Sequence, residues 1–287
     1  MRVAVCDGLV VGAAYAVRRR TPLAGTDLEP DDGWIPFFFV DPAHRRAGLG
    51  HRLLTDALDW LRGHGRSRVG FAAYAPHYVL PGLDRAAYPE ADRLLARLGF
   101  RTRYEAVAMD RSLVGYRLPE AVRRHEEALV ARGFRFGTPS DDDLVDLVRL
   151  AEGEFAPDWA RAIRHSLTCG APLERIVLAR APDGRLAGWA MHGAYEGAVE
   201  RFGPFGVRAE LRGAGLGKVL LHRTLARMRA LGAHGAWFLW TGEHGPAGRL
   251  YRHNGFTTTR TFAVLGWEEP GREEPGREGE GQCGGGR

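Results

Sequence analysis

Residues 202–232 read FGPFGVRAELRGAGLGKVLLHRTLARMRALG: an apolar run ending in Val, a charged turn, the pattern Arg-x-x-Gly-x-Gly, and then a stretch of helical periodicity. Residues 37–65, FFFVDPAHRRAGLGHRLLTDALDWLRGHG, repeat these features in the same order. Because such a repeat marks one structural unit present twice, two copies of one fold are predicted. The turn residues keep one offset of 167 between the copies: Arg45, Gly48 and Gly50 in the first, Arg212, Gly215 and Gly217 in the second.

A second match lies further along each copy. LLARLGF at 94–100 corresponds to LYRHNGF at 250–256, now with an offset of 156. The difference of 11 residues falls at about 74–86, where the first copy has the longer loop. In both copies the match ends a predicted helix, with glycine as the residue that stops it.

The second copy shows a complete series of elements. It predicts a short strand at 134–137, helices at about 140–155 and 158–167, and a hairpin around Pro182-Asp183-Gly184. A strand, the glycine turn, a helix, a strand, a helix and a last strand follow. The first copy repeats this order from its hairpin onward, but it lacks the opening strand and the two helices.

These patterns predict a mixed α/β (α+β) fold class with two domains. We assign 1–118 to a first domain truncated at its N-terminus, 119–133 to a linker helix, and 134–267 to a complete second domain. Residues 268–287 repeat EEPGR and hold no core-forming residues, which predicts a disordered tail.

The composition narrows the class of protein. Its 287 residues are 45% hydrophobic, which excludes a disordered or fibrous chain for the bulk of the sequence. No apolar run reaches the roughly 18–20 residues that a membrane span needs. Cys6, Cys169 and Cys283 show no paired spacing, so neither a disulfide framework nor a structural zinc site is indicated. We therefore expect a cytoplasmic protein with no metal and no membrane partner.

The charge of the chain says less about its binding partners than the composition says about its class. The net charge is +5, and among the 40 basic residues Lys218 is the only lysine. Basic and acidic residues alternate through most of the sequence, which is typical of a solvated surface rather than of a nucleic-acid-binding stripe. A nucleic-acid partner is therefore not favoured, although a local phosphate site fits the same charges.

The two glycine turns are the strongest functional signal. An Arg-x-x-Gly-x-Gly turn between a strand and a helix exposes several backbone N–H groups at the positive end of the helix dipole. Without side chains to block close approach, such a turn can hold a pyrophosphate. One turn alone is weak evidence, because glycines at strand-to-helix turns are common. Two turns, each preceded by a strand ending in Val and followed by a helix ending in Gly-Phe, are far more specific.

Both copies resemble the GNAT superfamily of acyl-CoA-dependent N-acyltransferases. VDPAHRRAGLG and LLARLGF carry the resemblance in the first copy, and VRAELRGAGLG and GRLYRHNGF carry it in the second. It implies a twisted mixed sheet flanked by helices in each domain, with pantetheine between two strands that splay apart. It also implies acetyl-CoA, or another acyl-CoA, as co-substrate.

The resemblance assigns roles to particular residues of the second copy. Val207 is expected to offer backbone groups to the pantetheine. Tyr251 stands where the family often has a tyrosine that protonates the leaving thiolate, whereas the first copy has Leu95 there. Catalysis is therefore expected in the second copy. The residues expected to bind the pyrophosphate are Arg212, Gly213, Ala214, Gly215, Leu216, Gly217 and Lys218.

The acceptor side is less defined by the sequence. An attacking amine must lose a proton, and Glu200 ranks first as the base and Glu243 second, with His192 and His244 also possible. Residues 152–159, EGEFAPDW, would wall the acceptor pocket and suit a cationic amine with an apolar body.

The predicted function is thus acyl transfer, with acetyl the expected group, to a small-molecule amine by a monomer or homodimer. The alternatives are a non-catalytic acyl-CoA-binding or interaction module, O-acyl transfer or decarboxylation on the same fold, and a nucleic-acid binder.

Overall fold

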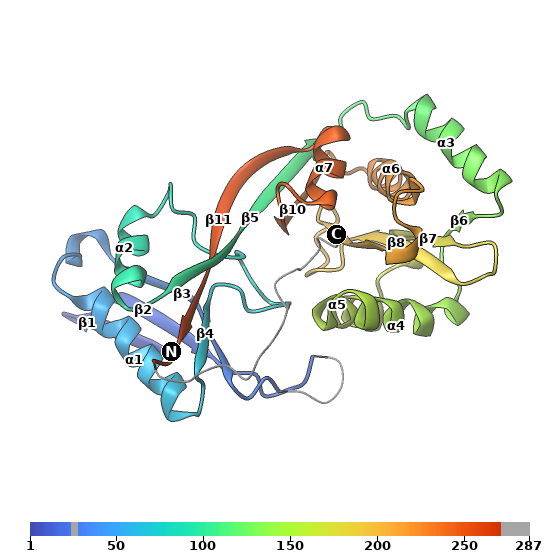
Figure 1. Ribbon diagram of the computed structural model, residues 1–287. Helices are drawn as coiled ribbons and strands as arrows, with labels where there is room; N and C mark the ends of the chain where they lie inside the picture. The colour runs from blue at the N-terminus through green and yellow to red at the C-terminus, as the bar shows by residue number, and fades with distance from the viewer. Residues whose placement is uncertain (24–27, 271–287) are drawn as a thin grey trace. The chain divides into compact units, whose positions relative to one another are not determined.

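The computed structural model describes residues 1–23 and 28–270, and it divides into two compact units (Figure 1). Within the described residues, unit 1 contains Met1–Val107 together with residues 260–270, and unit 2 contains Ala108–Thr259. The tail predicted to be disordered lies, from residue 271, outside the described residues. In the part of the chain that the structure describes, no helix has the length and apolar character that a bilayer crossing requires.

Unit 1 is a sheet with helices packed on it. Its strands belong to a seven-stranded sheet with the order β1-β2-β3-β4-β11-β5-β10. The pairs β1–β2, β2–β3 and β4–β11 are antiparallel, and the pair β3–β4 is parallel. Its elements are β1 (Arg2–Cys6), β2 (Leu9–Val17), β3 (Asp32–Val40), the 3-10 turn η1 (Pro42–His44), α1 (Leu49–Gly63), β4 (Arg68–Phe71), α2 (Pro89–Arg97), β5 (Arg101–Ser112) and β11 (Thr257–Glu268).

The core of unit 1 forms between α1 and the sheet. Leu54, Leu61 and other apolar residues of α1 repeat at helical spacing and pack on Ile35 of β3. Ala263, Leu265 and Trp267 of β11 alternate into the same core. Because these side chains are buried there, residues of β11 from Arg260 onward belong to unit 1, although the sequence placed this strand with the second copy.

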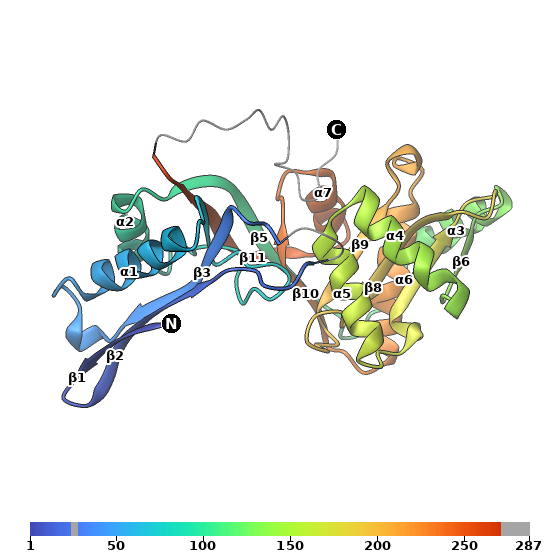
Figure 2. The ribbon, with the colours of Figure 1, turned by 90° about the horizontal axis from the view of Figure 1, so that it is seen from below.

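Unit 2 contains a second sheet, antiparallel in the order β6-β7-β8-β9. Helix α6 lies on one side of this sheet and α4 and α5 on the other (Figures 1 and 2). Its elements are α3 (Glu120–Ala131), β6 (Arg135–Gly137), η2 (Asp141–Asp143), α4 (Leu144–Glu154), α5 (Pro157–Thr168), η3 (Leu173–Arg175), β7 (Ile176–Arg180), β8 (Leu186–His192), β9 (Phe202–Val207), η4 (Ala209–Leu211), α6 (Leu216–Ala230), β10 (Gly235–Thr241) and α7 (Pro246–His253).

The predicted mixed α/β fold class is confirmed, including the helices at the start of the second copy. Ser140 and Asp143 form a capping box in front of α4. In unit 1 the corresponding sheet face carries no such helices within residues 1–23 and 28–107. Phe37 and Phe39, which alternate with the core-facing residues of β3, are therefore 45% and 47% exposed.

Candidate active site

The glycine turn of unit 2 (residues 208–217) joins β9 to α6. Gly213 and Gly215 both have φ of +84°, a left-handed conformation that glycine adopts without steric cost. The Arg212 side chain closes the turn, because its Nε donates a hydrogen bond of 3.2 Å to the carbonyl oxygen of Val207. Gly215 is the N-cap of α6, so the turn lies at the positive end of the helix dipole.

The backbone N–H groups of residues 213–217 are the ones that the sequence predicted to bind an anion. Among the described residues, none of these five groups has a hydrogen-bond acceptor, and the next residue, Lys218, donates to Gly215 O at 3.1 Å. Unpaired N–H groups at a helix N-terminus bind phosphate well. The residues present therefore fit the diphosphate of CoA.

Gly217 brings this turn close to α7. A Cβ atom at Gly217 would lie 3.3 Å from Cζ of Phe205 on β9 and 3.5 Å from Cδ2 of Leu250 on α7. The absent side chain lets α6, β9 and α7 approach one another. Tyr251, the next residue after Leu250, consequently lies in the same part of unit 2 as the glycine turn.

The Tyr251 side chain is 7% exposed and lies among aromatic rings. Its ring centroid is 4.4 Å from that of Phe238 on β10 and 6.2 Å from that of Phe205 on β9, so it contacts both strands. Burial raises the pKa of the Tyr251 phenol well above its ordinary value. Its hydroxyl has no hydrogen-bond partner among the residues that the structure describes. A neutral phenol held in this way can donate its proton.

Strands β9 and β10 meet at their start and then part. A single parallel bridge joins Arg201 to Trp237, and the Trp237 N–H donates to Glu200 O at 2.9 Å. Beyond this point β9 pairs only with β8 within the described residues. The other edge of β9 therefore offers free backbone groups to an extended ligand, as expected for pantetheine between splayed strands.

Glu200 lies at the closed end of this splay. Its Oε1 accepts hydrogen bonds from the backbone N–H groups of His234 at 2.7 Å and Gly235 at 3.0 Å. The carboxylate thus holds the start of β10 in place, a structural task that the sequence did not indicate. No hydrogen bond to its Oε2 is present in the described chain.

Glu243 lies at the other end of β10, just before α7. Its carboxylate pairs with Arg252 Nη1 at 3.6 Å and accepts a hydrogen bond from Thr258 Oγ1 at 3.2 Å. Since β10 spans seven residues, Glu200 and Glu243 are separated by about 20 Å along the strand. The structure therefore does not bring the two predicted bases together.

The two predicted histidines also differ in setting. His192 is fully buried, and its Nδ1 lies 2.8 Å from Val199 O. Burial lowers the pKa of His192. The His244 side chain, by contrast, is almost fully exposed.

Residues 152–159, which the sequence predicts to line an acceptor pocket (the predicted acceptor wall), pack on β9 beside the glycine turn through Phe155. Phe155 and Trp159 stack with centroids 5.6 Å apart, and Phe155 meets Trp189 edge-on at 4.9 Å. A Cβ at Gly206 would lie 2.5 Å from Phe155, so glycine is needed for this contact. Phe155 therefore packs against β9 next to Val207, with Trp159 stacked on it.

The acidic part of the wall behaves differently from the sequence expectation. Glu154 forms an ion pair with Arg208, the first residue of the glycine turn. Its charge is neutralised there and is not left free for a cationic acceptor, whereas Glu152 is exposed.

Sequence reasoning missed two features around α6. His125 of the linker helix α3 has its Nε2 3.2 Å from the carbonyl oxygen of Ala214 in the glycine turn. His222 of α6 is buried between Tyr116 and Asn254, with Nδ1 2.7 Å from the Tyr116 hydroxyl and Nε2 2.7 Å from Asn254 Oδ1. Burial raises the pKa of Tyr116 to about 12. Neither contact leaves a sequence signal, because each joins separate elements.

Unit 1 has the turn but not the phenol. Its glycine turn (residues 41–50) has Arg46 and Gly48 at positive φ, and Arg45 Nε donates to Val40 O at 3.0 Å. Leu95, at the position of Tyr251, is fully buried in the core. No proton donor replaces it at that position.

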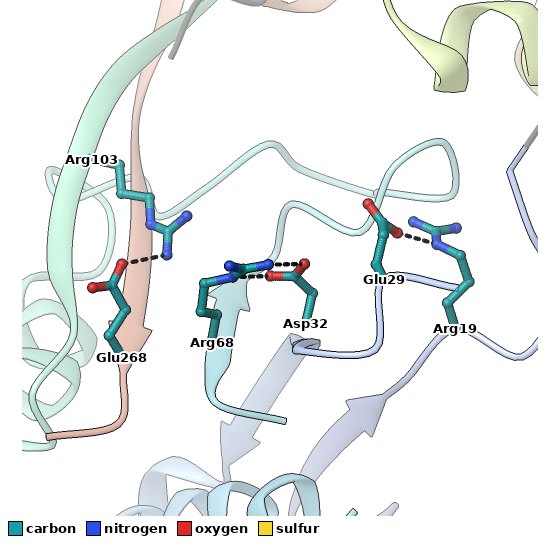
Figure 3. A network of polar contacts seen from close by, with 6 residues as sticks. All are labelled: Arg19, Glu29, Asp32, Arg68, Arg103 and Glu268. Atoms are coloured by element: carbon teal, nitrogen blue, oxygen red, sulfur yellow. Dashed lines mark hydrogen bonds and ion pairs between the residues drawn. The ribbon is translucent and has the colours of Figure 1, made fainter. Parts of the chain in front are cut away.

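In unit 1 an arginine side chain lies over the aromatic ring of Trp34 on β3. The guanidinium of Arg19 lies 5.1 Å from the Trp34 ring centroid and 5.0 Å from that of Tyr74, and it pairs with Glu29 (Figure 3). Arg68 of β4 binds the Asp32 carboxylate with two hydrogen bonds of 2.8 Å, as Figure 3 also shows. These contacts hold the two strands together.

Comparisons with known proteins agree with the two-copy organisation. The model of the acetyltransferase (GNAT) family matches residues 2–79 and 143–256. The chain is 28% identical over 243 residues to a mycothiol acetyltransferase of Saccharomonospora viridis, covering 77% of this chain and 70% of the relative.

Two solved structures share the fold. One is a GCN5-related glucosamine N-acetyltransferase region in a fungal multi-domain GH3 β-N-acetylglucosaminidase, with a TM-score of 0.74 and 19% identity; it aligns with 91% of this chain, which spans 32% of that protein. The other is a tandem GNAT protein from the clavulanic acid biosynthesis pathway, with a TM-score of 0.60, 18% identity, and coverage of 94% of this chain and 83% of that one.

The family match covers more than half of the chain. Each of its two regions contains one of the two glycine turns. Both glycine turns and GRLYRHNGF lie inside these regions, whereas LLARLGF at 94–100 lies beyond the end of the first one. The chain therefore belongs to the GNAT family of acetyltransferases, enzymes that transfer an acetyl group from acetyl-CoA to an amine.

Proposed function

We propose that unit 2 carries the reaction and that its acceptor is the amine of a small molecule. The observation that carries this proposal is the position of Tyr251. Its phenol is nearly buried, has no hydrogen-bond partner in the described chain, and contacts both β9 and β10 beyond the point where they part. Unit 1 has Leu95 at this place.

Binding of acetyl-CoA uses backbone groups of unit 2. The N–H groups of residues 213–217 hold the diphosphate, and Lys218 in the first turn of α6 adds positive charge. The free edge of β9 up to Val207 holds the pantetheine through its amide groups. Since these groups are fixed by the fold, binding requires little reorganisation.

Two proton transfers complete the reaction. The amine nitrogen attacks the thioester carbonyl, a C–N bond forms, and the C–S bond breaks. Tyr251 gives its phenol proton to the departing sulfur, which leaves as a thiol. Glu200 takes the proton that the amine loses, directly or through water, with Oε2 as the accepting atom. Glu243 is the second choice, because it is paired with Arg252 at the far end of β10.

The acceptor binds beside the acceptor wall. The stacked rings of Phe155 and Trp159 offer an apolar surface next to Val207, which suits an acceptor with an apolar or sugar face. The relative from Saccharomonospora viridis is a mycothiol acetyltransferase, so acceptors with mycothiol-related chemistry come first in a test.

The proposal is tested by combining binding with turnover. Calorimetric titration of the full chain with acetyl-CoA is expected to show binding that Gly215→Ala weakens and Tyr251→Phe leaves unchanged. Thiol release with a panel of amines is expected in the wild type and strongly reduced in Tyr251→Phe. Binding without release for any amine would instead support a non-catalytic acyl-CoA-binding module.

A further inference from the structure

Helix α3 is fastened along α6 in unit 2. Glu126 of α3 pairs with Arg223 of α6, and the Tyr116 hydroxyl, just before α3, bonds His222 of α6 at 2.7 Å. Val122 and Leu129 form the buried face of α3. This attachment places the linker helix beside the N-terminal end of α6, where the glycine turn lies.

His125 of α3 contacts the turn itself. Its Nε2–H donates to the carbonyl oxygen of Ala214, with 3.2 Å between the two atoms. The imidazole also occupies the space in which a Cβ atom at Gly215 would lie, so only glycine allows the ring this close. The turn in unit 1 lacks this contact, because a Cβ at Gly48 would meet nothing within 4 Å.

The contact determines which way one peptide group faces. In a trans peptide the C=O and the following N–H point in opposite directions. With Ala214 O held toward α3 by His125, the N–H of Gly215 points away from α3, to the other side of the turn. Since Gly215 has no side chain, its flanking peptide groups have more freedom than those of other residues, and an external hydrogen bond limits that freedom.

We infer that His125 is a positioning residue for acetyl-CoA: it orients the Ala214–Gly215 peptide so that the Gly215 N–H is ready for the diphosphate. This inference rests on the proposed function, because it assigns the diphosphate to the glycine turn of unit 2. His125 acts through the turn and takes no part in acetyl transfer. A linker helix between two copies of a fold thereby becomes part of the binding site of the second.

The test compares two donors with the full chain. Acetyl-CoA carries the diphosphate, and S-acetylpantetheine lacks it. His125→Ala is expected to raise the KM and the Kd for acetyl-CoA about 3- to 10-fold, the usual effect of one lost hydrogen bond, and to leave kcat within about 2-fold. The KM for S-acetylpantetheine stays the same. His125→Gln, whose amide N–H reaches a similar position, restores most of the affinity.

Controls separate this effect from a general loss of structure. Glu127→Ala changes an exposed residue of the same helix and is expected to behave as wild type. An equal loss with both donors, an unchanged KM for acetyl-CoA, or tighter binding of acetyl-CoA in His125→Ala would each overturn the inference. Failure of the wild type to bind acetyl-CoA would refute the proposed function and the inference with it, whereas wild-type binding that His125→Ala leaves unchanged refutes the inference alone.

Discussion

The two glycine turns have nearly the same backbone and different surroundings. Gly48 and Gly215 have φ of +78° and +84°, and in each copy the turn arginine bonds the last carbonyl of the preceding strand, at 3.0 Å and 3.2 Å. The last helix of each copy differs, because α2 of unit 1 has the buried Leu95 where α7 of unit 2 has the buried Tyr251. The motif thus encodes a turn, and the activity depends on what the rest of each unit places around it.

The strands beside the turns also differ between the units, in how far they pair before they part. In unit 1, β3 and β4 stay paired from Asp32–Arg68 to Ile35–Phe71. In unit 2, only Arg201 and Trp237 form a bridge before β9 and β10 part. At the offset of 167, Arg201 and Trp237 correspond to Trp34 and Gly70, so the strands part at nearly the same place in both units; the units differ in the longer pairing of β3 with β4 before that point.

The largest effect is expected when the phenol of Tyr251 is removed. Tyr251→Phe removes the proton donor and keeps the ring, so kcat is expected to fall about 10- to 1,000-fold with little change in acetyl-CoA affinity. Thiol release under saturating acetyl-CoA measures the fall. Because burial raises the pKa of Tyr251, wild-type activity is not expected to decline as the pH passes 10, where an ordinary tyrosine ionises.

Leu95→Met in unit 1 is the matched control for Tyr251→Phe. The substitution conserves volume in the core and is expected to leave kcat within about 2-fold of wild type. Loss of activity in Leu95→Met at unchanged stability, with Tyr251→Phe active, would move catalysis to unit 1.

The next effect compares the two turns directly. Gly215→Ala places a methyl group against His125 at a positive φ, so the KM for acetyl-CoA is expected to rise more than about 10-fold. Gly48→Ala has the same φ cost but meets no neighbour, so it lowers the stability of unit 1 by about 1–2 kcal/mol and leaves that KM unchanged. Equal changes in KM would show that both turns bind the donor.

Sequence and structure agree where the information is local. The repeat located both turns, and the helix ending at Gly255 located Tyr251, because these signals lie within short segments. Long-range pairing was not readable from the sequence: Arg260 onward of β11 packs in unit 1, and Glu154 pairs with an arginine 54 residues away. The contact of His125 with the turn belongs to the same class, since a helix pattern does not indicate which turn it will meet.

A smaller effect concerns the face that only unit 2 covers with helices. Phe155 lies on Gly206 of β9. The residue of unit 1 that corresponds to Gly206 is Phe39, and its side chain is half exposed. Phe155→Ala opens the acceptor wall, so the KM for the amine is expected to rise about 3- to 10-fold while the KM for acetyl-CoA changes less than about 2-fold. Steady-state kinetics with each substrate varied in turn measure both. Phe39→Ala is the control, and a rise in the amine KM in that variant would place the acceptor in unit 1.

The smallest expected effect is a difference between the two units in how their folding stability changes at acidic pH. His192 and His222 are buried in unit 2, and burial lowers the pKa of both; the described part of unit 1 has no buried histidine. The unfolded chain takes up protons on these rings near pH 6.5, whereas the folded chain resists until the pH is lower. Stability is therefore constant above about pH 6.5 and decreases below it.

Hydrogen exchange at pH 7.5 and 5.5, corrected for the intrinsic rates, resolves this response unit by unit. Amides of α6 are expected to lose protection at pH 5.5, and those of α1 are expected to keep theirs, since carboxylates titrate near pH 4 and do not contribute in this window. His222→Gln, which cannot take up the proton, reduces the loss in α6 even if it lowers the baseline. An equal loss in α1 would show that acid acts on the whole chain and not through the buried histidines of unit 2.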